Sequence, residues 1–180
     1  MGERLSAVRA ATEGDSARAG GRRFAAPLGT FFVAAAPRRR MDYLEVEGAR
    51  EFVARLAHGD DWRAQIEAFA ADEGIDAAFF FGLGAVQDAE ILYYDQDDEE
   101  YYPETFDEPL EMAACVGNVS HLDGEPFAHT HAVLSREDGT TLAGHLDSAT
   151  VFAGELYVRE FDAALDREYD EETALDLWPL

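Results

Sequence analysis

The strongest constraint on the fold of this chain is the alternation of side chains on both sides of one glycine, Gly139. In residues 127–134 and 141–146 the even-numbered positions are mainly apolar, which gives the period of two that β-strands show. Glu137-Asp138-Gly139 separates the two segments, and glycine readily adopts the left-handed conformation that a tight loop needs. The sequence therefore predicts an antiparallel hairpin over residues 127–146.

The apolar residues also select the register of this hairpin. With a three-residue loop, Leu134 lies opposite Leu142 and the leucines of both strands share one face. A two-residue loop at Asp138-Gly139 would divide them between the two faces, so the hydrophobic pattern favours the first register. The expected pairs on the polar face are then His131 with His145 and His129 with Asp147. Three imidazoles therefore gather on one side of the hairpin.

The gathered histidines, His129, His131 and His145, are a candidate metal site. Neutral imidazole suits Zn²⁺ and similar divalent ions, and three such ligands leave a fourth position open for water or a substrate. Asp147 is a candidate acceptor for a ring N–H, which would fix the tautomer of that ring. The alternative, ordinary histidines on a polar face or at a subunit interface, remains open. Two further histidines lie in turn-like sequence typical of the surface: His58 and His121.

The sequence before the hairpin contains one clear helical pattern. Asp60-Asp61 offers an N-cap, apolar side chains follow at helical spacing from Trp62 to Ala70, and Gly74 suits the position after the last turn. The other segments have strand patterns: Leu44–Val46, Arg50–Leu56, Ala77–Val86, Ala89–Asp95, Tyr101–Phe106, Leu110–Val119 and Thr150–Phe161. Ala77–Val86 is apolar throughout, which predicts a strand buried on both faces. One helix covering a mostly antiparallel sheet predicts a single compact α+β domain.

Charge divides the chain at Met41. All 14 basic residues are arginines and eight of them lie in residues 1–40, whereas residues 41–180 carry 6 Arg against 35 Asp and Glu, a formal charge of −29. An acidic, lysine-free body is similar to that of proteins from extreme halophiles, in which concentrated salt screens the repulsion between carboxylates. We therefore interpret most of the acids, including Asp95–Glu100, as solvated surface.

The composition also suggests how the chain is divided. The basic leader, residues 1–40, has three interpretations: an export signal around Arg22-Arg23, a flexible tail, or translated sequence upstream of a true start at Met41. The change in composition at Met41 favours the last. We expect the domain to span residues 41–162, followed by an acidic tail, residues 163–180, whose apolar residues dock onto the body.

The cysteine content and the apolar runs indicate the compartment. A single cysteine, Cys115, excludes an intramolecular disulfide framework and fits a reducing, cytoplasmic environment. No apolar run reaches the roughly 18 residues that a membrane span needs. We therefore expect a cytoplasmic protein without a membrane partner.

Several segments together resemble the plant and prokaryote conserved (PPC) domain. The resemblance runs from about Tyr43 to Phe161 and rests on Gly82-Leu83-Gly84-Ala85, Glu108–Val119, Gly124-Glu125-Pro126-Phe127, His129–Leu134 and Gly144-His145. It implies a homotrimer of α+β subunits whose fold is distantly similar to acetolactate decarboxylase. It also implies that the metal-site histidines of prokaryotic members correspond to His129, His131 and His145. The chain is similar to a haloarchaeal-type member, and it lacks the Arg-Gly-Arg-Pro AT-hook of plant members.

Three functions follow from these features. The first is a homotrimer with a three-histidine zinc or other divalent-metal site in a structural or regulatory role. The second is DNA binding, as prokaryotic relatives are often labelled, but DNA affinity depends on Lys and Arg and the acidic body has no basic stripe. The third is a metal-dependent lyase or hydrolase for a small oxo-acid, with Glu155 or Asp147 as acid or base if either lies close to the metal. Charge and the missing hook favour the first.

Overall fold

The computed structural model describes residues 41–180, so the leader and its interpretations lie outside the described residues. Following the chain, the elements are β1 Gly48–Leu56, α1 Trp62–Glu73, β2 Ala78–Val86, β3 Ala89–Asp95, β4 Glu100–Phe106, β5 Leu110–Leu122, β6 Glu125–Ser135, β7 Thr141–Ser148, β8 Val151–Phe161, β9 Glu168–Asp170 and β10 Leu175–Leu177. Within this range no helix is both long enough and apolar enough to cross a bilayer.

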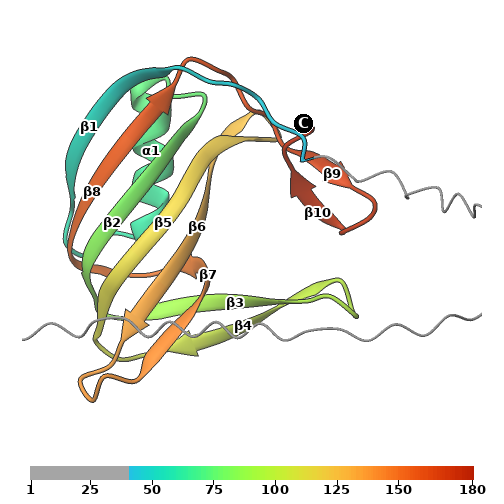
Figure 1. Ribbon diagram of the computed structural model, residues 1–180. Coiled ribbons are helices and arrows are strands. Elements are labelled where there is room, and N and C mark those ends of the chain that lie inside the picture. Colours follow the sequence, from blue (N-terminus) through green and yellow to red (C-terminus); the bar gives the residue numbers. More distant parts are fainter. Residues whose placement is uncertain (1–40) are drawn as a thin grey trace, which may run out of the picture. The chain divides into compact units, whose positions relative to one another are not determined.

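Eight of these strands form one sheet in the order β1-β8-β2-β5-β6-β7-β3-β4, and every neighbouring pair is antiparallel. Helix α1 packs on one face of the curved sheet, and the β3–β4 hairpin projects away from its lower end (Figure 1). The separate β9–β10 hairpin projects on the same side of the molecule. The predicted α+β class, one helix on an antiparallel sheet, is confirmed.

Helix α1 begins and ends at the residues that the sequence predicts. The carboxylate of Asp61 accepts a hydrogen bond from the amide of Ala64 at 2.8 Å, which caps the first turn. Gly74 follows the last turn with φ of 65°, and its backbone N–H donates hydrogen bonds to the carbonyls of Ala70 and Ala71. Trp62, Ile66 and Ala70 face the sheet.

The β6–β7 hairpin has the register that the leucines select. Leu134 pairs with Leu142, Ala132 with Gly144 and His131 with His145. Gly139 has φ of 82°, in the left-handed region, and the amide of Gly139 donates to the carbonyl of Arg136 at 2.9 Å. The predicted register is therefore confirmed from the loop to His131 and His145, where the ladder ends, and the expected pair of His129 with Asp147 does not form.

The N-terminal strand prediction is wrong in part. Residues 44–46 are not in a strand, and β1 starts at Gly48. The reason lies in its partner: β8 ends at Phe161, which pairs with Gly48, so this strand does not extend far enough to pair with residues 44–46.

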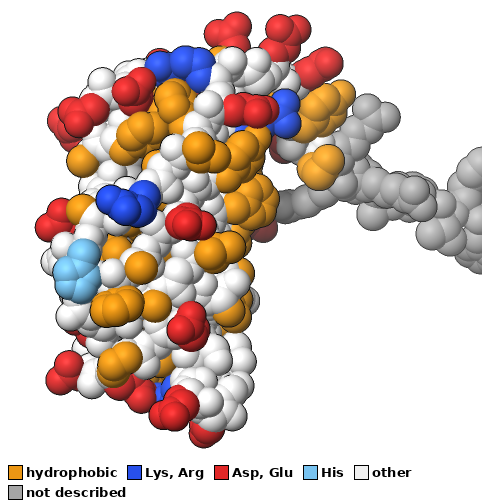
Figure 2. All heavy atoms as spheres, turned by 90° about the vertical axis from the view of Figure 1, so that its left-hand side faces the viewer, with side chains coloured by type: hydrophobic (Ala, Val, Ile, Leu, Met, Phe, Trp, Pro, Cys, Tyr) orange, Lys and Arg blue, Asp and Glu red, His pale blue; other side chains and the backbone are white. Residues whose placement is uncertain are grey.

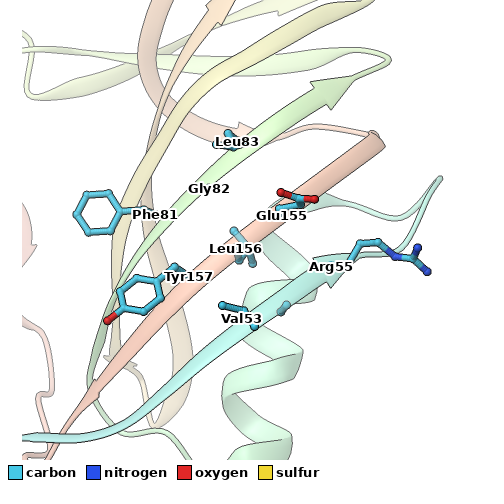
Figure 3. Close-up of a pocket in the computed structure, with 9 residues that line it drawn as sticks. Val53, Arg55, Phe81, Gly82, Leu83, Glu155, Leu156 and Tyr157 are labelled. Carbon is cyan, nitrogen blue, oxygen red and sulfur yellow. The ribbon is translucent and has the colours of Figure 1, made fainter.

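The sheet face opposite α1 exposes apolar side chains, so the prediction that Ala77–Val86 is buried on both faces is also wrong. Phe80 on β2 is fully buried, whereas Phe81 and Leu83 are each 58% exposed. Hydrophobic side chains gather on the side of the molecule formed by β1, β8 and β2 (Figure 2). With Val53 and Tyr157 they line a hollow of about 540 Å³ (Figure 3). A continuous apolar run in the sequence does not show whether each face of the strand is buried or exposed.

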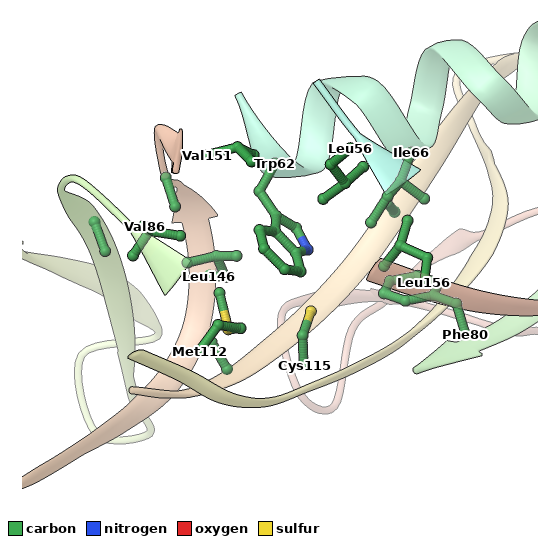
Figure 4. Close-up of a cluster of buried hydrophobic side chains, with 14 of the residues drawn as sticks. Leu56, Trp62, Ile66, Phe80, Val86, Met112, Cys115, Leu146, Val151 and Leu156 are labelled. Carbon is green, nitrogen blue, oxygen red and sulfur yellow. The ribbon is translucent and has the colours of Figure 1, made fainter. Parts of the chain in front are cut away.

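The core lies between α1 and the sheet, with Trp62 at its centre (Figure 4). The indole is fully buried and occupies space that two glycines leave open. A Cβ at Gly82 would lie 3.0 Å from Cζ2 of Trp62, and a Cβ at Gly154 would lie 2.8 Å from its Cζ3. Glycine at these two positions of β2 and β8 therefore creates the slot that the largest core side chain fills.

Candidate metal centre

Two neighbouring strands carry the three candidate ligands. His129 and His131 are two residues apart on β6 and therefore point to the same face, and the hairpin register brings His145 of β7 beside them. Each ring offers one nitrogen such that these atoms all lie within 4.8 Å of one another. The ring centroids are 5.1 to 5.5 Å apart. The structure thus brings together all three histidines that the sequence singles out.

The surroundings of the cluster favour uncharged rings. Burial, and after it the positive charge of Arg167, lowers the pKa of His129 from its usual value to about 4. Burial, followed by the charges of His131 and Arg63, lowers the pKa of His145 to about 4. His131 is the exposed member of the group. At neutral pH the rings of His129 and His145 therefore keep lone pairs that can bind a metal.

One buried ring nitrogen of the cluster has no hydrogen-bond partner among residues 41–180. Nδ1 of His145 is buried and makes no hydrogen bond to any of the residues 41–180. A buried polar atom without a partner costs about 1–3 kcal/mol unless something else satisfies it. A set of three imidazoles with an unsatisfied buried nitrogen fits a borderline divalent ion such as zinc.

The two carboxylates considered from the sequence lie in different places. Asp147 accepts a hydrogen bond from Nη1 of Arg63 at 3.3 Å, and its charge raises the pKa of His145 against the larger lowering effects. Its role as acceptor for a ring N–H stays a prediction. Glu155 lies on β8, which β2 and β5 separate from β6, and it borders the hollow of Figure 3 instead.

The other two histidines lie away from the cluster. His58 is exposed, and its Nδ1 lies 2.8 Å from the carbonyl oxygen of Phe152. His121 is half-buried between two carboxylates, with nitrogen–oxygen distances of 3.6 Å to Asp76 and 3.8 Å to Asp166. Neither belongs to the three-histidine group.

Sequence reasoning missed Arg167. It follows β8 in the chain and lines a pocket of about 180 Å³ together with His129 and His145. No motif marks this residue. The only signal that could have found it is that it is the single basic residue among the acidic residues 163–180.

The comparisons with known proteins point to one family. The family model of the Plants and Prokaryotes Conserved (PCC) domain matches residues 43–162. A metal-containing protein from Archaeoglobus fulgidus is 43% identical, with a TM-score of 0.74 over 77% of this chain and 99% of that chain. A plant- and prokaryote-conserved (PPC) protein from Pyrococcus horikoshii is 30% identical, with a TM-score of 0.74 over 78% and 98%. A protein from Ralstonia eutropha, named as a candidate DNA-binding protein, is 29% identical, with a TM-score of 0.64 over 71% and 90%. Among curated proteins no sequence matches.

Proposed function

Because the chain belongs to the Plants and Prokaryotes Conserved (PCC) domain family, we propose that it is a homotrimeric metal protein with a structural or regulatory role. His129, His131 and His145 would hold the ion. Zinc is the ion proposed, since three imidazoles are a typical zinc ligand set. When bound, such an ion can polarise a carbonyl oxygen or lower the pKa of water.

The observation that carries this proposal is the convergence of three imidazoles on one hairpin, with one nitrogen of each ring within 4.8 Å of the others. The buried, unsatisfied Nδ1 of His145 supports it, because an ion bound to that nitrogen would give it a partner. The metal content of the Archaeoglobus fulgidus protein, at 43% identity, supports it independently.

The apolar sheet face supports association between copies of the chain. Val53 is 88% exposed, and Phe81 and Leu83 are each 58% exposed on the neighbouring part of the sheet. Contiguous apolar surface of this kind favours burial against another protein surface. The family resemblance implies that three copies associate. The apolar face lies on the side of the sheet opposite α1, so an interface there would not disturb the packing of the helix.

A structural or regulatory role is proposed ahead of catalysis because of where the carboxylates lie. Glu155 is on β8, three strands along the sheet from β6. Asp147 already accepts from Arg63. A metal-dependent hydrolase or lyase also needs a positioned proton donor or acceptor, and neither residue provides one that is free and close to the cluster.

Metal analysis tests the proposal directly. Full-length protein purified without a His tag, exposed to Zn²⁺ and then dialysed, should retain about one ion per chain. The His131→Ala variant should retain close to none, because two imidazoles hold zinc far more weakly than three. His58→Ala is the matched control, since His58 lies outside the cluster and should leave the content unchanged. Undiminished zinc in His131→Ala would remove the proposal.

DNA binding is the second candidate, and the similarity to the Ralstonia eutropha protein favours it. The charges of the described residues argue against DNA binding. Four of the six arginines in residues 41–180 form ion pairs with carboxylates: Arg50, Arg63, Arg136 and Arg159. Paired arginines in a body of formal charge −29 offer few cations to neutralise phosphates.

We therefore expect no retardation of a DNA duplex by a chain that starts at Met41, in gel-shift titrations from low to molar salt. The full-length chain, which adds the eight arginines of residues 1–40, is the comparison. Retardation by the shorter chain that weakens steeply with salt would show phosphate contacts from the body and would make DNA binding the better proposal.

A further inference from the structure

A pocket of about 180 Å³ adjoins the histidine cluster, and the metal site does not account for all of it. His129 and His145 form one side. Tyr101 of β4 and the strand β10 form others, so both projecting hairpins contribute walls. The hydroxyl of Tyr94 donates to the carbonyl of Thr173 at 2.7 Å, which ties the β3–β4 hairpin to the β9–β10 hairpin. The cluster therefore borders a small pocket to which both hairpins contribute residues.

Arg167 is held in this pocket by neutral groups. Its Nε donates to Oγ of Ser120 at 3.0 Å, its Nη2 to Oδ1 of Asn118 at 2.8 Å, and its Nη1 to the carbonyl of Asp176 at 2.8 Å. These three bonds use three of the five N–H groups of a guanidinium. Two N–H donors remain, on a side chain whose position is already fixed.

The charge of Arg167 is also not matched by a partner. Within residues 41–180 no carboxylate forms an ion pair with it. The side chain is half-buried, and the rings of Phe127 and Trp178 lie 5.3 and 5.7 Å from its guanidinium carbon. A desolvated cation without a carboxylate is the arrangement in which an anionic ligand gains most.

One carboxylate, that of Asp176, borders the pocket and opposes an anion there. Its single negative charge faces the charge of Arg167 and, once the site is loaded, the two charges of a divalent ion. The summed charge of Asp176, Arg167 and the ion remains positive. The remaining walls are apolar, from Leu122, Leu175 and Leu177, and suit the hydrocarbon end of an organic ligand.

We propose that this pocket binds a small organic carboxylate, which Arg167 recognises through its two free N–H groups beside the metal. The inference rests on the proposed metal function, because the ion supplies most of the positive charge. The planar fork of a guanidinium matches the two oxygens of a carboxylate. The pocket volume of about 180 Å³ suits a small acid.

Calorimetric titration of propanoate into the Zn²⁺-loaded, full-length protein tests this proposal. Propanoate should bind, while its neutral isostere propanamide should bind at least about tenfold more weakly, as should inorganic phosphate, which has no apolar end. Arg167→Met should weaken propanoate binding at least about tenfold, and Arg167→Lys should restore part of the loss because it keeps the charge. Arg136→Met is the control, since Arg136 pairs with Glu108 away from the pocket.

Zinc content is measured on the same samples, so the two proposals fail separately. Wild-type protein that holds zinc but does not bind propanoate overturns the carboxylate proposal and leaves the metal site standing. Wild-type protein without zinc overturns both. Equal affinity for propanamide, tighter binding of phosphate, or full affinity in Arg167→Met also overturns it. If Arg167→Met does not fold, the amide comparison and Arg167→Lys still decide the matter.

Discussion

Replacing Trp62 with alanine should lower the free energy of unfolding by about 3–5 kcal/mol. The indole is fully buried at the centre of the core, and the neighbouring positions Gly82 and Gly154 carry no side chains that could move into the vacated space. The variant therefore loses apolar burial and keeps a cavity. Urea unfolding followed by circular dichroism measures the difference, in about 1 M KCl so that the acidic surface is screened.

The second tryptophan of the chain provides the control. Trp178 is only half-buried near the C-terminus, so Trp178→Ala should cost clearly less than Trp62→Ala. If Trp62→Ala fails to fold, Trp62→Phe, which leaves a smaller cavity, should still unfold at a lower urea concentration than wild type. Equal urea midpoints for wild type and both Trp62 variants would mean that the packing of Trp62 between α1 and the sheet does not stabilise the fold.

Zinc should raise the stability of the wild-type protein by about 4 kcal/mol when its concentration is about a thousand times its dissociation constant. The ion would bind only the folded chain, because the hairpin register assembles the three ligands. In His145→Ala the gain should disappear, since that substitution removes the ligand contributed by β7. Thermal or urea unfolding with and without Zn²⁺ measures the shift.

Two controls make the zinc result specific. Mg²⁺ prefers oxygen ligands and should give no comparable shift. His121→Ala, whose ring lies between Asp76 and Asp166 outside the cluster, should keep the full gain. A zinc shift in His145→Ala as large as in wild type would place the stabilising ion elsewhere on the acidic surface.

Local patterns explain why much of the fold and the candidate cluster could be predicted. Helix α1 is set by neighbouring residues, Asp61 at its start and Gly74 after its end. The β6–β7 register depends on one loop glycine and on leucines within the same hairpin, and that register decides where His145 lies. When all the determinants lie within a few residues of one another, sequence periodicity is sufficient.

The features that could not be predicted depend on residues far apart in the chain. Strands β9 and β10 have three residues each, too few to show an alternation. Arg167 reaches the site because Asn118 and Ser120 of β5 hold it, and nothing in the local sequence shows this contact. The exposure of Phe81 likewise depends on what covers the sheet and not on β2 itself.

Because side chains alternate along β2, its two faces are under different constraints: one packs in the core and the other is exposed. Phe80, turned toward α1, belongs to the core, whereas Phe81 and Leu83, turned the other way, take no part in it. If this face joins the copies of the proposed homotrimer, substitutions at these outward positions should alter solubility and assembly while the unfolding free energy of the chain stays nearly constant. Related chains can therefore diverge in how they assemble without risking the fold that supports the histidines.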